Sequence, residues 1–157
     1  MKKEINIDIA MAGVVDIVNI KAYYTGKSKT ADEDPTAVIS DIVDEDNAFV
    51  VVGSLKRATG NLKSVIGEYA PNDLSVGGTE ATPTVTGKIT MPDNYDDSAT
   101  SAVTESVRQY CESAVLYDWF AVTTPADAEH YAQQMVRALG DLRASMRRRT
   151  RPTRKSQ

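Results

Sequence analysis

The sequence contains one cysteine, Cys111, and one histidine, His130, among 157 residues. A single cysteine forms neither an internal disulfide nor a cysteine-based zinc cluster. Cys111 lies in an apolar stripe with helical spacing, so we expect core packing rather than catalysis beside His130. His130 stands between Glu129 and Tyr131 at a predicted helix start, which favours a surface or half-buried histidine. We therefore predict no catalytic residue, no metal site, no cofactor and no enzymatic activity.

Long apolar runs are also missing. No run of about eighteen apolar residues occurs, so we predict no membrane-spanning helix. The first residues, MKKEINIDIAMAGVVDIVNI, have the lysines and the apolar stretch of a signal peptide, but Glu4, Asp8 and Asp16 interrupt that stretch. We therefore reject a secretory segment. The run SVGGTEAT is not followed by Lys-Ser or Lys-Thr, which excludes a phosphate-binding loop.

Acidic residues are absent from the end of the chain, RASMRRRTRPTRKSQ. All 22 acids and eleven of the 18 basic residues precede Arg143, so the body carries about −11 and the end +7. Guanidinium groups bind phosphate or carboxylate through two parallel hydrogen bonds. We therefore predict contact with an anionic surface: nucleic acid, an acidic partner or a second copy of the chain. The cations are Arg143, Arg147, Arg148, Arg149, Arg151, Arg154 and Lys155.

Residues 147–157 are called the basic arm. The charge pattern predicts that the last helix continues into the arm as far as Pro152, because cations suit the negative end of a helix dipole.

Helical periodicity occurs in several segments, although Ile5, Ile7 and Ile9 alternate weakly like a strand. The predicted helices are 8–25, about 35–42, a long helix from about 49 to 69 that ends before Pro71, one that begins with Ser98 as N-cap, and one that begins at Thr124-Pro125. In the long helix, Gly53, Gly60 and Gly67 lie seven apart on one face. They are either tolerated small residues or a groove that admits another helix closely.

A β-hairpin is predicted over about 73–92. Val85, Gly87, Ile89 and Met91 alternate with polar residues, and 74–76 is a candidate partner strand. Because an isolated hairpin is marginal in water, we expect it to lie on the helices or to pair with another chain.

The last two predicted helices are joined by only a few residues and therefore form an antiparallel pair. We predict a mainly α chain: a bundle of four to five helices over 1–146, with the hairpin between the second and third main helices, followed by the arm. Candidate core or interface residues are Trp119, Phe120, Tyr131, Val85 and Ile89.

Residues 89–152 resemble the small head–tail connector (adaptor, or head-completion) proteins of long-tailed phages and prophages. The matching residues are Pro92, Asn94 and Tyr95 before a helix, Trp119 near its end, Glu129 and Tyr131 in the next helix, and Arg151-Pro152. The N-terminal half matches by architecture only, and its Thr/Gly-rich hairpin and three helical glycines depart from the pattern. These are structural residues without a catalytic signature.

The resemblance implies a structural virion protein of the phage neck, made in the host cytoplasm. It implies a homo-oligomeric ring, with a dodecamer expected, that joins the portal to the next neck or tail protein while DNA passes through the lumen. An acidic body suits a channel in which DNA slides, and the arm is expected to dock on the portal or on a neighbouring subunit. The alternative is a small nucleic-acid-binding protein that uses its Arg-rich tail.

Overall fold

The computed structural model describes residues 3–11, 48–69, 71, 74–78, 83–123 and 125–151. They form, in order, β1 (Lys3–Ala10), α2 (Ala48–Val65), a short 3-10 helix (Gly67–Tyr69), β2 (Ser75–Gly78), β3 (Pro83–Met91), a second 3-10 helix (Asp97–Ala99), α3 (Thr100–Thr123) and α4 (Pro125–Met146). This part of the chain is mostly helical, with a three-stranded antiparallel sheet beside three α-helices.

The expected bundle of four to five helices is therefore wrong for the described residues. The predicted helix 35–42, and the predicted helix 8–25 beyond residue 11, lie outside them. At Asp8–Ala10 the helical prediction is contradicted, because these residues continue β1. The alternation of Ile5, Ile7 and Ile9 decides the conformation there. All three side chains are buried, and a helical backbone would turn Ile7 away from the face that Ile5 and Ile9 share.

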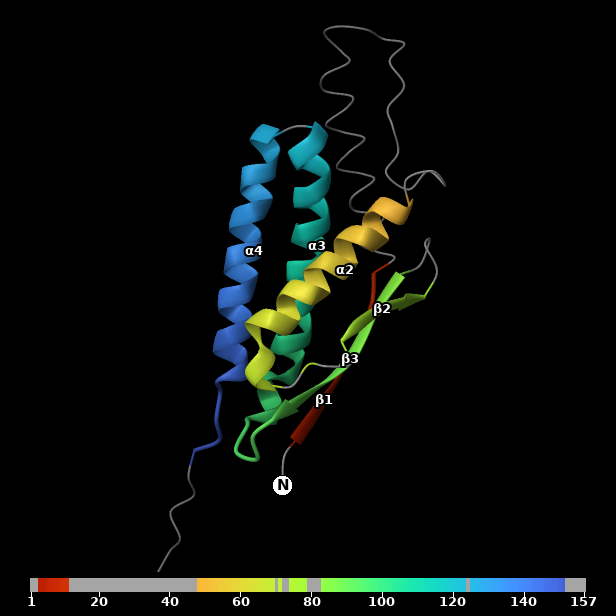
Figure 1. Cartoon of the computed structure of the whole chain (residues 1–157). Coiled ribbons are helices and arrows are strands. Elements are labelled where there is room, and N and C mark those ends of the chain that lie inside the picture. Colours follow the sequence, from red (N-terminus) through yellow and green to blue (C-terminus); the bar gives the residue numbers. More distant parts are fainter. Residues whose placement is uncertain are drawn as a thin grey trace, which may run out of the picture.

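The elements are arranged around a core that the sheet, α2 and α3 share. Figure 1 shows α3 and α4 side by side, α2 crossing them obliquely, and the sheet lying alongside. The short connection between α3 and α4 makes them antiparallel, as predicted. The hairpin prediction is also confirmed, since β2 and β3 pair and lie against the helices.

The sheet has the order β1-β3-β2, so β3 is central and β1 is an edge strand. Ile5 lies opposite Ile89, and Ile9 opposite Val85, on the face that packs against the helices. The other face is polar, as the alternation predicted. Val85 and Ile89 are fully buried, so they belong to the core of this chain.

Gly87 allows β3 to lie directly against the residue before β2. A Cβ atom at this position would come within 2.6 Å of the Leu74 Cα and 2.9 Å of its backbone nitrogen. Leu74 is itself fully buried, so neither chain segment has room to withdraw. A residue without a side chain is therefore required where the two segments meet.

The three glycines of the predicted long helix form no packing groove for another described part of the chain. α2 ends at Val65, and Gly67 belongs to the following 3-10 helix. A Cβ at Gly60 or Gly67 would meet nothing within 4 Å, and one at Gly53 only the Arg57 guanidinium at 3.8 Å. Within the described residues, they are tolerated small residues.

Candidate interaction site at the base of the basic arm

The turn before α3 is organised by Asp96. Its carboxylate accepts hydrogen bonds from the backbone N–H of Ser98 at 3.0 Å and from the Ser98 hydroxyl at 2.7 Å. These bonds lower the pKa of Asp96, and the nearby charges of Arg148 and Lys3 lower it further. The prediction that Ser98 is the N-cap is wrong, because Asp96 caps a 3-10 turn that leads into α3.

The arm begins as a strand-like segment rather than as a helical extension. α4 ends at Met146, and Arg149 forms a β-bridge with Tyr95. The backbone N–H of Asp96 donates to the Arg148 carbonyl at 3.2 Å, and that of Thr150 donates to the Asn94 carbonyl at 2.9 Å. The predicted continuation of the helix to Pro152 is therefore wrong. The backbone of Arg148 and Thr150 forms hydrogen bonds with the turn at residues 94–96 instead of continuing the α-helical pattern.

The Arg149 side chain helps to end α4. Its guanidinium donates to the carbonyl of Met146 at 2.7 Å and to that of Arg148 at 3.0 Å. The last carbonyls of a helix have no partner within the helix, so a cation that reaches back to them acts as a cap. Arg149 thus has a structural role at the base of the arm, although its position in the charge run suggests a surface contact.

The start of β1 reaches the same turn. The Lys3 ammonium donates to the Tyr95 carbonyl at 3.0 Å and forms an ion pair with Asp97, also at 3.0 Å. Tyr95 is fully buried, and its hydroxyl lies 3.3 Å from that of Thr100. Three segments far apart in the sequence therefore meet at one end of the molecule. We call this end, formed by Lys3, residues 92–98 and residues 146–151, the arm pole.

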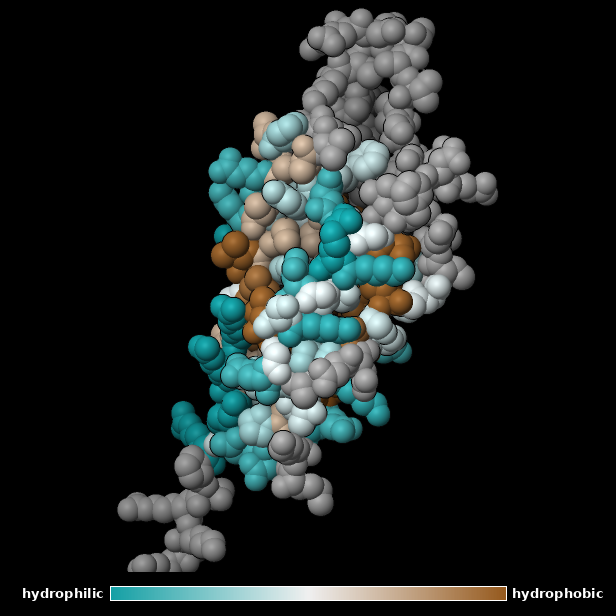
Figure 2. Space-filling model, viewed as in Figure 1, coloured by the Kyte–Doolittle hydropathy of each residue, from teal (hydrophilic) through white to brown (hydrophobic). Residues whose placement is uncertain are grey.

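Two arginines of the arm pole, and Arg143 on the last turn of α4 just before it, take no part in the contacts that hold this end together. Arg143, Arg147 and Arg151 are exposed, and their side chains make no ion pair or side-chain hydrogen bond with another described residue. Figure 2 shows hydrophilic side chains gathered over this end of α4, whereas hydrophobic patches lie further along the same face. Arg154 and Lys155 lie outside the described residues.

The aromatic candidates belong mainly to the helical core. Phe120 on α3 and Tyr131 on α4 are both buried and stack with ring centroids 5.3 Å apart and planes 12° from parallel. Trp119 is half-buried and packs against the core. The stacked rings therefore hold the end of α3 against the start of α4.

Cys111 is buried in α3, and burial raises the pKa of its thiol to about 12. The thiol is therefore protonated and poorly nucleophilic near neutral pH. His130 is exposed and hydrogen-bonds Gln134 at 3.0 Å rather than Cys111. The structure thus places the two residues in separate surroundings, as the sequence predicts.

A groove of about 350 Å³ lies between α3 and α4, lined by residues that include Arg108, Glu112, Gln134 and Arg137. Arg108 is already held by Glu112 at 3.0 Å and by Glu105 on its own helix. Its charge is therefore neutralised locally, and the groove is a weaker candidate for anion binding than the arm pole.

No group of three His, Cys, Asp or Glu residues among the described residues is placed to hold a metal ion. None of their helices is both long and apolar enough to cross a membrane.

Comparison with known proteins adds no relative: no family model, curated protein or solved structure matches the chain.

Proposed function

We propose that the chain is a structural protein of a phage neck, which forms a ring between the portal and the next neck or tail protein. One observation carries the proposal. The basic arm is tied by backbone hydrogen bonds to the turn that bears Pro92, Asn94 and Tyr95, three of the residues in the connector resemblance. The turn of that pattern therefore fixes the place where the arm leaves α4, just before the Arg-Pro of the same pattern.

The charge distribution supports the same function. The body is strongly acidic, so it repels the phosphates of DNA and suits a channel through which DNA moves without adhering. Arg147 and Arg151 are exposed at the arm pole, where an acidic protein surface can approach them. A ring-shaped connector needs one surface that binds a neighbouring protein and another that repels DNA. The basic arm and the acidic body would supply these two surfaces.

Assembly state tests the proposal directly. The full chain, examined by light scattering and electron microscopy at rising concentration, should form closed rings and show little affinity for duplex DNA at low salt. A monomer or dimer that binds DNA tightly at low salt and loses it steeply as salt rises would contradict the proposal.

Docking to an isolated portal tests the arm. Arg149 caps α4, so the informative variant replaces Arg147, Arg151, Arg154 and Lys155 by glutamine and keeps Arg149. We expect this variant to fold and to lose docking. A control with Arg108→Gln and Arg137→Gln in the α3–α4 groove should dock normally.

The second candidate function is nucleic-acid binding through the arm. It is favoured by the same exposed arginines, because guanidinium groups bind phosphate as well as carboxylate. The salt dependence of DNA binding distinguishes the two functions: neutralising four phosphates gives a slope of log K against log salt of about −3.6, whereas a connector arm gives almost none.

A further inference from the structure

The outer edge of β1 is a vacant strand-pairing site within the described part of the chain. Among the described strands, β1 is the terminal one of the sheet and pairs only with β3. The backbone N–H of Met11 donates to the Pro83 carbonyl at 2.9 Å, which extends the β1–β3 register by one residue. Since backbone groups alternate in direction, the odd residues of β1 bond to β3 and the even ones point outward.

The outward positions are Glu4, Asn6, Asp8 and Ala10, all exposed. No backbone hydrogen bond links them to another described residue. Native edge strands are commonly protected by proline, bulges or charged side chains. β1 has no proline, and the charges at its outward positions, Glu4 and Asp8, are both acidic, so they repel an acidic or identical strand but not a basic one. Such an edge is suited to accept an added strand from another chain.

The side chains at this edge select for a basic strand. Glu4 and Asp8 lie on the polar face of the sheet, four residues apart, with Asn6 between them. Directly opposite side chains in paired strands interact most strongly, and opposite charges stabilise the pair. Two antiparallel copies of β1 centred on Asn6 would instead place Glu4 against Asp8, so pairing of this edge with itself is disfavoured.

The basic arm has the complementary pattern. Arg151 and Lys155 are four residues apart with Thr153 between them, so an antiparallel strand places Lys155 opposite Glu4, Thr153 opposite Asn6 and Arg151 opposite Asp8. In this register the backbone of Pro152 points away from β1. Proline has no N–H to donate, so it occupies a position where none is needed.

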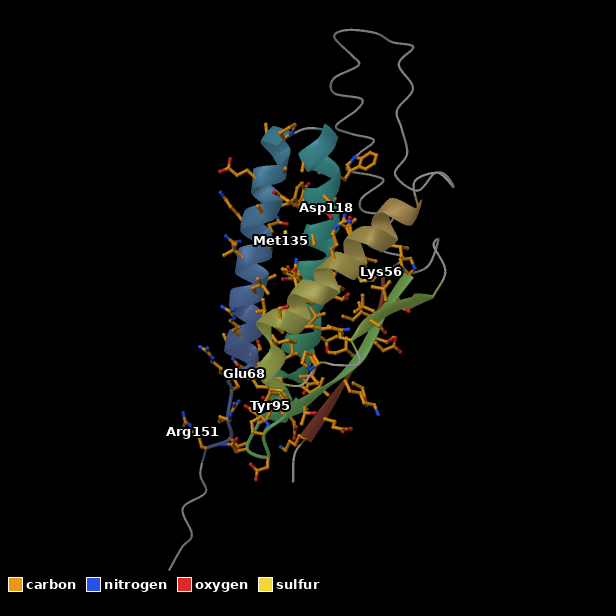
Figure 3. The ribbon with its side chains drawn as sticks, viewed as in Figure 1. Lys56, Glu68, Tyr95, Asp118, Met135 and Arg151 are labelled. Atoms are coloured by element: carbon orange, nitrogen blue, oxygen red, sulfur yellow. The ribbon has the colours of Figure 1, made fainter. Side chains whose placement is uncertain are left out.

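Geometry assigns the arm to a different copy of the chain. Arg151 is two residues from Arg149, which bridges Tyr95, and Lys3 contacts Tyr95 at the start of β1. Asp8 lies five residues further along β1, roughly 17 Å, whereas two residues span about 7 Å. Figure 3 shows Arg151 on the side of Tyr95 away from the sheet.

We propose that residues 151–155 of one copy add as a fourth strand to the β1 edge of the next copy. This inference rests on the ring proposed above and names the surface that its arm binds. The contact joins two different surfaces, arm and edge, and is therefore head-to-tail. Repetition of a head-to-tail contact produces a closed ring when the rotation per copy allows closure.

A disulfide tests the register. Equal amounts of an Asn6→Cys chain and a Thr153→Cys chain are mixed under mild oxidation. Opposite residues in such a pair are about 5.5 Å apart at Cα, which a disulfide spans, so a mixed dimer should form. Cys111 is buried and does not compete. The matched control pairs Asn6→Cys with Arg154→Cys, whose side chain lies on the opposite face. Equal yields from both pairs would overturn the proposal.

A charge reversal tests the recognition. Glu4→Lys with Asp8→Lys should weaken self-association about tenfold at low salt, and adding Arg151→Glu with Lys155→Glu to the same chain should restore it. Glu129→Lys with Asp141→Lys, two exposed acids on α4, is the control matched in charge. The proposal fails if this control weakens association equally or if restoration does not occur.

The outcomes also separate this inference from the proposed function. Rings that survive reversal at β1 keep the connector function and place the arm elsewhere, for instance on the portal. A native chain that stays monomeric at every concentration removes both proposals.

Discussion

The Thr150 N–H donates to the Asn94 carbonyl at 2.9 Å, and the Thr150 hydroxyl lies 3.3 Å from the same oxygen. The backbone bond, with the bridge between Tyr95 and Arg149, turns the chain out of α4 and into a strand-like path. The contact spans more than fifty residues of sequence and decides where the arm leaves the body.

Removing that donor should release the base of the arm. Thr150→Pro deletes the N–H, and Arg149 before it tolerates proline because it is already extended. We expect a loss of unfolding free energy of about 0.5–1.5 kcal/mol and faster hydrogen exchange at Asp96. Thr150→Val, which keeps the N–H and loses only the hydroxyl, is the control and should exchange like the native chain.

The contact between Gly87 and Leu74 should make two glycine substitutions act in opposite directions. Gly87→Ala brings a Cβ within 2.6 Å of the Leu74 backbone and should destabilise the chain by about 1–3 kcal/mol. Gly60→Ala, in open space on α2, should stabilise it by about 0.5–1 kcal/mol. Urea unfolding of both variants measures the difference, and equal effects would show that the close approach is absent.

Much of the architecture can be predicted from the sequence because local patterns and global packing agree. The period of three to four residues predicts α2, α3 and α4, and the alternation at Val85 and Ile89 predicts β3. The conflict lies at β1, where Asp8–Ala10 fits the start of a helical pattern and the end of an alternating one. Pairing with β3, more than seventy residues away, resolves that conflict and cannot be deduced from local periodicity.

The arm pole could be predicted only in part. The sequence predicts which residues carry the positive charge, because the last fifteen residues contain seven cations and no acid. The different roles of the two arginines depend on the path of the chain: Arg149 caps α4 and bridges Tyr95, whereas the Arg151 side chain contacts no other described residue through an ion pair or hydrogen bond. The Pro-x-Asn-Tyr-Asp run signals a turn, but nothing in a single sequence indicates that this turn holds the arm.

Burial of the Cys111 thiol predicts a specific dependence of stability on pH. Its pKa in the folded chain is about 12, above the ordinary value of 9.0. Between those values the folded chain holds a proton that the unfolded chain releases, so unfolding free energy falls as pH rises above about 9. Cys111→Ala should flatten the decline measured by urea unfolding as pH rises above about 9. An unchanged slope would mean that the thiol is not desolvated.

Asp96 should act in the opposite range of pH. Its pKa is lowered from 3.8, chiefly by the hydrogen bonds from Ser98, so its contribution is present above that value and disappears as pH falls through the lowered one. Asp96→Ala should be less stable than the native chain at neutral pH, and the gap should close in strong acid. Ser98→Ala should reproduce part of the effect. A gap that persists in acid would assign the loss to packing instead.

The bridge between Tyr95 and Arg149 also has a consequence for folding during synthesis, because its two partners leave the ribosome at different times. Asn94 and Tyr95 leave the ribosome well before Arg149, because domains emerge from the N-terminus onward. The bridge between them forms only when the last part of α4 has cleared the exit tunnel. A nascent chain therefore lacks the bridge between Tyr95 and Arg149, and the two hydrogen bonds beside it, until Thr150 has emerged.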